Sequence, residues 1–319
     1  MSKRILITGA SGFIGANLAR RALRDGHEVH LLLRPGYRTW RLDEIASHLH
    51  LHEADLADGS TVRDAVHRIR PDWVFHLAAY GAYPSQQDVE RMTSTNLPGC
   101  VALLDACVET GVGAFLNAGS SSEYGFKDHA PDEDDALEPN SLYAITKAAA
   151  THYCRLKGRE SGVNAVTVRL YSVYGPYEDP GRLIPSLIVH GLNGRLPPLV
   201  SSEIARDFIY VDDAVDAMIR IATSTVPPGS IYNVCSGVQL NLGEVVRTAT
   251  QLMGVNAKPV WSSMKERSWD TDVWVGTGAR LERELGWRAS TSFAEGLRQT
   301  VDWFRAYPDK STRNSEIPY

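Results

Sequence analysis

The sequence lacks the long apolar stretches that cross a membrane. Its first residues, MSKRILITGA, reach a glycine after a short apolar run, and no later stretch approaches the length of a membrane span. A basic excess is also missing, since 33 lysines and arginines stand against 38 acidic residues and the net charge is −5. Nucleic acids and membranes are therefore not expected as partners, small molecules are favoured, and we expect a cytoplasmic protein.

Cysteine is scarce and shows no spacing that suggests chemistry. The four cysteines, at positions 100, 107, 154 and 235, form no Cys-x-x-Cys pair and lie in apolar contexts. Buried free thiols in a reducing compartment are favoured over disulfides or metal ligands.

Histidine shows one spacing that a metal could use. In SHLHLHEADL, His48, His50 and His52 alternate and would share one face of a strand. No matching set of carboxylates or cysteines accompanies them, so we favour a partly exposed strand and predict no metal site.

The first half of the chain alternates short aliphatic runs with amphipathic stretches. The aliphatic runs include RILIT, HEVHLLL, LHLHEAD, DWVFHLAA and AFLNAGS, and the amphipathic ones include FIGANLARRALRDG, STVRDAVHRIR and NLPGCVALLDACVETG. Strands that alternate with helices of ten or more residues predict an α/β fold with a doubly wound parallel sheet. NAVTVRLYSVYG is interpreted as one more buried strand.

The glycines of RILITGASGFIGANL have the spacing of a nucleotide-binding loop. Gly9, Gly12 and Gly15 follow the first strand and precede a helix. A turn without side chains lets the backbone approach a pyrophosphate, and the helix offers unpaired amide hydrogens and a positive dipole end. We predict a Rossmann-type dinucleotide site with the loop residues Gly9, Ser11, Gly12, Phe13, Ile14 and Gly15.

Beyond about residue 175 the chain is richer in loops. YEDPGRLIP and NGRLPPLV carry the proline and glycine that mark turns. We predict a dinucleotide-binding domain over residues 1–174, to which 207–235 returns, and a smaller, mainly substrate-binding lobe over 175–319. Ligands of such sheets bind outside the carboxyl ends of the strands, so we expect the site in a cleft between the lobes.

An arginine directly after the second strand favours NADP(H) as the cofactor. HEVHLLLRPGYRTWRL supplies Arg34 where a carboxylate would grip the ribose hydroxyls of NAD. A guanidinium instead pairs with a 2′-phosphate through charge-assisted hydrogen bonds. NAD(H) stays possible, and a solvated basic loop is an open alternative for Arg38 and Arg41, but less so for Arg34 directly at the strand end.

NSLYAITKAAATHYC carries a pair of residues suited to proton transfer. Tyr143 and Lys147 are four residues apart, so they share one helical face. A neighbouring ammonium favours the phenolate and lets the tyrosine exchange a proton with a substrate oxygen near neutral pH.

With these motifs the sequence resembles the extended short-chain dehydrogenase/reductase family of nucleotide-sugar epimerases, dehydratases and reductases. The resemblance runs over nearly the whole chain, in the order TGASGFIG, ADLAD, VFHLAA, NLPGC, GSSSEYG, PDEDDALEPNSLYAITK, VRLYSVYGP, ARDFIYVDDAV and ELGW. It implies hydride transfer between nicotinamide and a sugar carbon, with Tyr143 as acid/base, Lys147 on the nicotinamide ribose and Ser120 bonding the reacting oxygen. The further cofactor contacts that it implies are Asp55, Leu56, Leu77, Ala78 and Ala79.

The same resemblance implies contacts to a nucleotide-sugar substrate. Arg206 of ARDFIYVDD and Arg267 of ERSWDTD would bind its diphosphate, where a permanent cation suits phosphate oxygens. HLAAYGAYPSQQD brings Tyr80 and Tyr83 to the expected sugar position, either as aromatic walls or as core packing. The remaining expected contacts are Ser121, Ser122 and Ser172, the last at a position where the family often has asparagine.

The position of Glu123 in NAGSSSEYGF argues against dehydration. The 4,6-dehydratases of the resembled family carry an acid and a base where Ser121 and Ser122 stand here, so Glu123 lies one residue too late. If the strand continues, one step turns its side chain to the opposite face, although a bulge would return it to the site. We expect Glu123 to support the loop rather than act as a base.

The favoured activity is NADPH-dependent 4-ketoreduction of a nucleotide-linked 4-keto-6-deoxyhexose. Arg34 favours it, because a net reductase exchanges spent cofactor, and HLAAYGAY and GSSSEYGF are similar to reductases of the paratose and abequose synthase type. A nucleotide-sugar 4-epimerase with tightly bound NAD is the main alternative. A 4,6-dehydratase or a catalytically silent cofactor-sensing protein is less favoured.

The resemblance also implies a homodimer. Two helices, expected over about 96–111 and 143–160, carry apolar and small residues at helical spacing. Paired with a second copy they would form a four-helix bundle, although packing on the sheet alone also explains the pattern.

Overall fold

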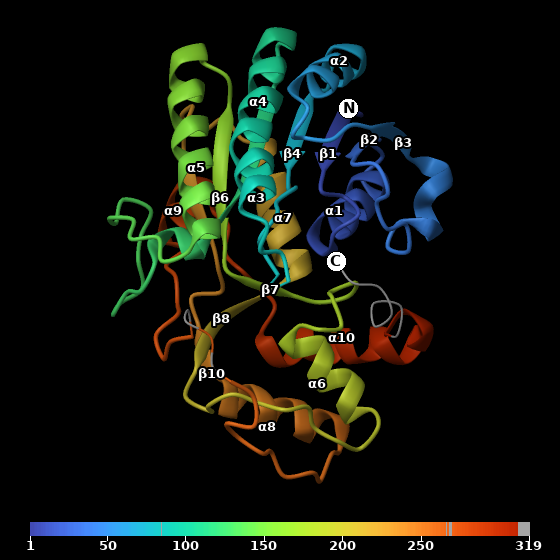
Figure 1. The fold of residues 1–319 in the computed structure, drawn as a ribbon, viewed down its shortest axis with the longest axis vertical. Helices are drawn as coiled ribbons and strands as arrows, with labels where there is room; N and C mark the ends of the chain where they lie inside the picture. Colours follow the sequence, from blue (N-terminus) through green and yellow to red (C-terminus); the bar gives the residue numbers. More distant parts are fainter. Residues whose placement is uncertain (84, 266, 268–269, 312–319) are drawn as a thin grey trace.

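The computed structural model describes residues 1–83, 85–265, 267 and 270–311. Within these residues, a large sheet of seven strands forms the centre of the upper lobe in Figure 1. Every neighbouring pair in this sheet is parallel. Its strands lie in the order β3 (His50–Glu53), β2 (Glu28–Leu33), β1 (Arg4–Thr8), β4 (Trp73–His76), β5 (Ala114–Ser120), β6 (Ala165–Leu170) and β9 (Ile231–Val234).

Helices cover both faces of this sheet, as the alternation of strands and helices predicts. Ile5 and Ile7 of β1 pack in the core that contains α1 (Phe13–Arg24) and α7 (Val211–Ala222). Leu6, between them, faces the other core, which is built with α2 (Gly59–Ile69), α4 (Pro98–Thr110) and α5 (Leu142–Ser161). Because successive strand residues face opposite ways, a strand buried on both sides has to be apolar throughout, and this confirms the Rossmann-type fold class.

The lower lobe is built around a small sheet in the order β10 (Gln239–Asn241), β8 (Ala205–Tyr210) and β7 (Ser172–Tyr174). The helices α6 (Leu183–Gly191), α8 (Leu242–Met253) and α10 (Phe293–Ala306) pack together beside it (Figure 1). The shorter elements are α3 (Val89–Asn96), α9 (Ala279–Leu285) and three 3₁₀ turns, η1 (Asp43–His48), η2 (Ser121–Tyr124) and η3 (Pro308–Ser311).

The segment NAVTVRLYSVYG is not one strand, as predicted, but two. β6 ends at Leu170 and belongs to the large sheet, whereas β7 begins at Ser172 and pairs with β8 in the small one. Between them the Tyr171 amide donates to the Val234 carbonyl, and Tyr171 itself is buried. Both strands of this run are largely apolar, so its hydrophobicity does not reveal the break between them.

Two further expectations can be compared with the structure. The four cysteines are free and buried, as predicted. β9, in the segment expected to return to the first domain, pairs with β6 of the large sheet, but β8, in the same segment, belongs to the small sheet.

None of the described helices is long and apolar enough to cross a membrane.

Candidate active site

The glycine loop between β1 and α1 leaves no room for side chains. Gly9 has a φ of +72°, and a Cβ there would lie 2.5 Å from the Ala78 amide nitrogen. A Cβ on Gly15 would lie 2.5 Å from the Gly9 carbonyl oxygen. Gly12 caps α1 without a side-chain hydrogen bond, and the first turn of the helix contains no acidic residue. The loop and helix end therefore fit the pyrophosphate of a dinucleotide, because backbone amides and the dipole face it uncovered.

The ends of β2 and β3 form the expected adenosine side of this site. Arg34 is exposed and follows Leu33, the last residue of β2, directly. The neighbouring strand end leads to Asp55 and Leu56, since the Ala54 amide donates to the Leu33 carbonyl at 2.9 Å. Strand pairing thus brings Arg34 and Asp55 to the same edge of the sheet.

Arg41 does not lie in a solvated loop, which was one interpretation of this basic segment. Its side chain is buried, and Nε donates to the Tyr177 carbonyl at 2.7 Å. Nη1 donates to the carbonyl of Ser11 at 3.2 Å. Arg41 therefore links the segment after β2 to the nucleotide loop, through Ser11, and to the loop after β7, through Tyr177.

Ser120 lies at the carboxyl end of β5, where the strand gives way to the 3₁₀ turn η2. Its hydroxyl oxygen accepts a hydrogen bond from the Ser122 amide at 3.1 Å. That bond orients the oxygen and leaves the hydroxyl hydrogen to be donated elsewhere. Ser121 is buried in the turn, and Ser122 is half-buried.

Tyr143 and Lys147 lie on α5, which packs against β5 and η2. The helix begins directly before Tyr143 because the Ser141 side chain caps it, accepting a hydrogen bond from the Ala144 amide at 3.2 Å. Tyr143 is half-buried and Lys147 is buried, with 3% of its surface exposed. The helix that carries the predicted acid/base pair therefore packs against the strand that ends at Ser120.

Leu77, Ala78 and Ala79 follow β4 and are half-buried beside the nucleotide loop. The Ala78 amide donates to the Thr8 hydroxyl at 3.2 Å, which links the ends of β1 and β4. This close approach is the reason that Gly9 has no room for a side chain.

Glu123 turns away from the site and into the protein. Its carboxylate is fully buried, accepts a hydrogen bond from the Ser120 amide at 2.8 Å and pairs with Arg169 Nε at 3.0 Å. The turn is therefore neither the continued strand nor the bulge considered from sequence, but a capped 3₁₀ turn. Gly119 makes room for it, because a Cβ there would lie 2.7 Å from Glu123 Oε1.

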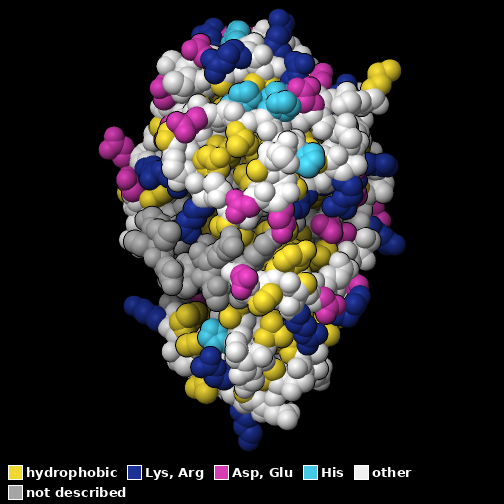
Figure 2. All heavy atoms as spheres, turned by 90° about the vertical axis from the view of Figure 1, so that its right-hand side faces the viewer, with side chains coloured by type: hydrophobic (Ala, Val, Ile, Leu, Met, Phe, Trp, Pro, Cys, Tyr) yellow, Lys and Arg dark blue, Asp and Glu magenta, His cyan; other side chains and the backbone are white. Residues whose placement is uncertain are grey.

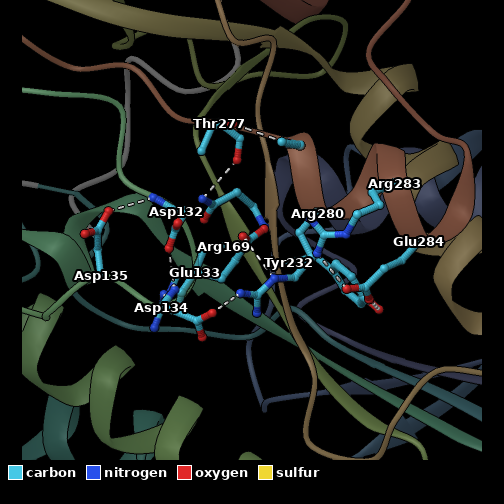
Figure 3. Close-up of polar contacts among 12 residues, drawn as sticks. Asp132, Glu133, Asp134, Asp135, Arg169, Tyr232, Thr277, Arg280, Arg283 and Glu284 are labelled. Carbon is cyan, nitrogen blue, oxygen red and sulfur yellow. Dashed lines mark hydrogen bonds and ion pairs between the residues drawn. The ribbon is translucent and has the colours of Figure 1, made fainter.

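A polar network holds Arg169 in place (Figure 3). Arg169 Nη1 donates to the Tyr124 hydroxyl at 2.8 Å and to the Glu133 carbonyl at 3.4 Å. Glu133 is itself buried, accepts a hydrogen bond from the Asn233 amide at 2.8 Å and pairs with Arg280. These bonds anchor the acidic stretch PDEDD against β9 and fix Glu123 on the side of the turn that faces the core.

The two arginines predicted to bind a diphosphate lie around one aspartate. Arg206 Nη2 donates to Asp270 Oδ1 at 2.7 Å, and the Arg267 amide donates to Asp270 Oδ2 at 2.8 Å. The Arg206 guanidinium also lies over the Trp274 ring, 5.3 Å from its centroid. Burial lowers the pKa of Arg206, although Asp270 opposes the shift. Arg267 is exposed at the surface.

An open depression of about 540 Å³ is lined by residues 126–129, which follow Gly125, by Glu138, and by residues 271–273, which follow Asp270. Its lining is therefore adjacent in sequence to the turn after β5 and to the arginine group, although Ser120, Arg206 and Arg267 are not part of it.

Tyr83 and Ser172 lie on the other expected walls. The Arg182 guanidinium stacks on the Tyr83 ring at 4.7 Å and donates to the Ala82 carbonyl at 2.8 Å. Ser172 is half-buried at the start of β7, opposite Phe208 of β8.

Residues 5–235, most of the chain, match the NAD dependent epimerase/dehydratase family. The chain belongs to this family. A dTDP-glucose 4,6-dehydratase of Mycolicibacterium smegmatis is 31% identical over 95% of this chain and 93% of its own length. The solved structure of a Thermus thermophilus UDP-glucose 4-epimerase in complex with NAD is 29% identical, with a TM-score of 0.85 over 95% of this chain and 99% of that one.

Some relatives in the epimerase/dehydratase family are much longer. A trifunctional Arabidopsis thaliana protein, with UDP-glucose 4,6-dehydratase, 3,5-epimerase and reductase in its name, is 26% identical over 96% of this chain and 48% of its own length. The chain thus spans about half the length of this curated relative.

Sequence reasoning missed two side chains that shape this member of the family. Asn96 is buried, accepts from the Tyr80 amide at 2.8 Å and donates to Thr146 Oγ1 at 3.0 Å, so it fastens the loop after β4 to the catalytic helix. Its signal was present, as the first residue of NLPGC. Glu178 is buried beside Arg182 and Asp179, and nothing in YEDPGRLIP marks it as an inward-facing carboxylate.

Proposed function

We propose that the protein reduces the 4-keto group of a nucleotide-linked 4-keto-6-deoxyhexose with NADPH. The observation that carries this proposal is the contrast at the catalytic turn. Ser120 lies at the end of β5 and Tyr143 on α5, two elements that pack together, whereas the Glu123 carboxylate is bound by the Ser120 amide and Arg169. The site has acid/base groups for a carbonyl, but serines at the two positions where elimination of water needs carboxylates.

The residues of the chain serve the reaction in distinct ways. A nicotinamide cofactor bound against the glycine loop supplies the hydride. Tyr143 gives its phenolic proton to the oxygen at C4, and the ammonium of Lys147 stabilises the phenolate that remains. Ser120 donates its hydroxyl hydrogen to the same oxygen, which steadies the charge that develops there. Arg206 and Arg267 would bind the diphosphate of the substrate, with Asp270 keeping the two in position.

Arg34 supports NADPH over NADH. Its guanidinium is exposed at the end of β2, and Arg41 holds the following segment against Ser11 of the nucleotide loop. A 2′-phosphate on the adenosine ribose would meet the positive charge of Arg34 there. Replacing Arg34 with alanine should raise KM for NADPH and leave KM for NADH nearly unchanged. Equal effects on both cofactors would contradict this assignment.

A nucleotide-sugar 4-epimerase is the second candidate. It is favoured by the likeness to the Thermus thermophilus UDP-glucose 4-epimerase, whose solved structure contains NAD. An epimerase returns the hydride to the sugar from which it came, so it needs the same serine, tyrosine and lysine but no external supply of reduced cofactor.

Loss of NADPH absorbance against a panel of nucleotide-linked 4-keto-6-deoxyhexoses tests the two candidates. Stoichiometric oxidation is expected, with the best substrate identifying the nucleotide. Absence of oxidation, together with NAD retained in the purified protein and interconversion of UDP-sugars, would replace the reductase with the epimerase.

Substituting Tyr143 with phenylalanine should lower kcat by about 10²- to 10⁴-fold, the contribution typical of a positioned acid, and leave NADPH binding intact. Tyr153→Phe is the matched control, because Tyr153 lies on the same helix but bonds Asp105 instead. Comparable rates for the two variants would remove Tyr143 from its role.

We also propose a homodimer through α4 and α5. Ile145 and Leu156 leave large apolar side chains exposed on α5, each about half accessible. A second copy would cover them by four-helix packing. Leu156→Glu should shift the sedimentation of the protein from dimer to monomer, and a wild-type monomer would overturn this assembly.

A further inference from the structure

Four side chains from two neighbouring strands meet on one face at the edge of the large sheet. Glu28 and His30 lie two residues apart on β2, and His50 and His52 lie two apart on β3. His30 is paired in register with His50, so their side chains point the same way. In Figure 2, histidine side chains lie together on the upper part of the face that carries this edge. The sequence showed only the β3 histidines; the carboxylate that seemed to be missing comes from the neighbouring strand.

The donor atoms are close enough to share one cation. Glu28 Oε1 lies 2.8 Å from His30 Nε2 and 3.9 Å from His50 Nε2. The ligand atoms of these three residues lie within 4.8 Å of one another. Donors bound tetrahedrally to zinc at about 2.0–2.2 Å are separated by roughly 3.3–3.5 Å. Reaching that spacing requires shifts of roughly 0.5 Å to at most about 1.3 Å, which the exposed side chains of Glu28 and His50 can make around the buried His30.

We propose that Glu28, His30 and His50 form a binding site for a divalent transition metal such as zinc. Two imidazoles and a carboxylate are ligands that such ions prefer, and an exposed edge leaves room for water at the fourth position. The site is separate from the cofactor region, which lies at the opposite ends of the same strands.

His52 is a hydrogen-bond partner of the ligand His30 rather than a ligand itself. Its Nε2 lies 2.9 Å from His30 Nδ1, and the two rings are stacked at 5.1 Å. With a metal on Nε2, His30 carries its proton on Nδ1 and donates it to His52, which fixes the orientation of the ring.

The surrounding charges leave one carboxylate oxygen for the metal. Arg4 Nε lies 3.5 Å from Glu28 Oε2, the oxygen that does not face the histidines. Arg4 is also held by the Ile69 carbonyl, at 2.8 Å from Nη1, so it does not depend on Glu28. Arg68 is the other positive charge that acts on this cluster, through His52.

A bound metal would join β3 to β2 at the start of both strands. β3 is short and lies at the edge of the sheet, where it pairs with β2 alone. Binding to the folded state only raises the stability of that state by mass action. The consequence is a metal-dependent thermal stability, with no part for the metal in the reaction itself.

Zinc titration of the full chain tests the proposal. The protein is purified without a histidine tag, treated with a chelator, dialysed, and titrated with Zn²⁺ in a calorimeter, with Co²⁺ absorbance as a second probe of coordination. We expect one saturable site per chain and a Zn²⁺-dependent rise in the melting temperature. His50→Ala should abolish both effects, and Glu28→Gln should weaken binding strongly. His52→Ala should lower the affinity by about 10- to 100-fold, the effect typical of an outer hydrogen-bond partner.

His48→Asn is the matched control, because His48 is a neighbouring exposed histidine that contacts Ser47 rather than the cluster. It should bind Zn²⁺ as the wild type does. His50 is exposed, so its removal leaves the fold intact, which circular dichroism verifies. The proposal is overturned if the wild type shows no saturable binding, if binding persists in His50→Ala, or if His48→Asn loses it equally.

Discussion

Two buried glutamates, one in each segment that borders the site, are held in opposite ways. Glu123, in the turn of residues 120–125, pairs with Arg169 and accepts a hydrogen bond from the Ser120 amide. Glu178, in the segment of residues 175–182 that crosses to the second lobe, has an oxygen, Oε2, without a hydrogen-bond partner among the described residues. Burial raises the pKa of Glu178 to about 8, although Arg182 nearby opposes the shift.

The difference shows that burial alone does not determine what a carboxyl group does. With a cation and an amide in contact, a buried carboxylate stabilises a turn and is removed from chemistry. Where burial outweighs such partners, as at Glu178 despite Arg182 and the Gly175 amide, the carboxyl group keeps its proton to a higher pH and makes the stability of the protein depend on pH.

The largest expected effect on stability comes from removing the ion-pair partner of Glu123. Arg169→Met would leave the Glu123 carboxylate buried and uncompensated, and it should lower the free energy of unfolding by about 3–5 kcal/mol. Denaturant unfolding measures the change. Arg298→Met is the control, since it removes an ion pair with Glu295 that is exposed to solvent, and should leave the midpoint almost unchanged. Similar losses in the two variants would contradict the importance of burial.

A smaller loss of stability is expected when a methyl group is added at Gly119, directly before the turn of residues 120–125. Gly119→Ala would place a Cβ 2.7 Å from both Glu123 Oε1 and Thr167 Cγ2. Neither neighbour can move freely, so the free energy of unfolding should fall by about 1–3 kcal/mol. Gly181→Ala makes the matching change in the other segment, where the nearest atom, Asp179 Oδ1, lies 3.2 Å from the new Cβ. A loss in Gly181→Ala as large as that in Gly119→Ala would show that the turn is not the tighter of the two.

The third effect is measured as a change in stability per pH unit, and it tests the role of Glu178. The folded pKa of Glu178, about 8, lies above its ordinary value of 4.5, so the folded state binds the proton more tightly than the unfolded state. Stability should therefore fall by up to about 1.4 kcal/mol per pH unit as the pH rises between these two values. Glu178→Gln should remove this part of the slope in unfolding free energy, and Glu282→Gln, at an exposed carboxylate, should keep it. A slope unchanged by Glu178→Gln would refute the assignment.

Local patterns were enough to predict most of the large sheet and the nucleotide loop. The turn after the first strand has no room for side chains, and this shows as the glycine spacing of residues 9, 12 and 15. The four-residue spacing of Tyr143 and Lys147 likewise places both on one face of a helix, so a few residues are enough to predict each feature. The direction of Glu123 was inferred correctly but for an incomplete reason, because its partner Arg169 lies 46 residues further on. The histidine cluster needs the register of β2 on β3, which no short stretch of sequence contains.

The order of the strands also governs how the protein emerges during synthesis. β6 ends at Leu170, but its outer neighbour β9 begins only at Ile231, after β7, β8 and α7 have been made. Until then a nascent chain presents β6 as an open, apolar edge, the type of surface on which unfinished chains pair with one another. The first lobe therefore completes its sheet only after β7, α6 and β8 of the second lobe have been synthesised, and before β10, α8 and α10 are made.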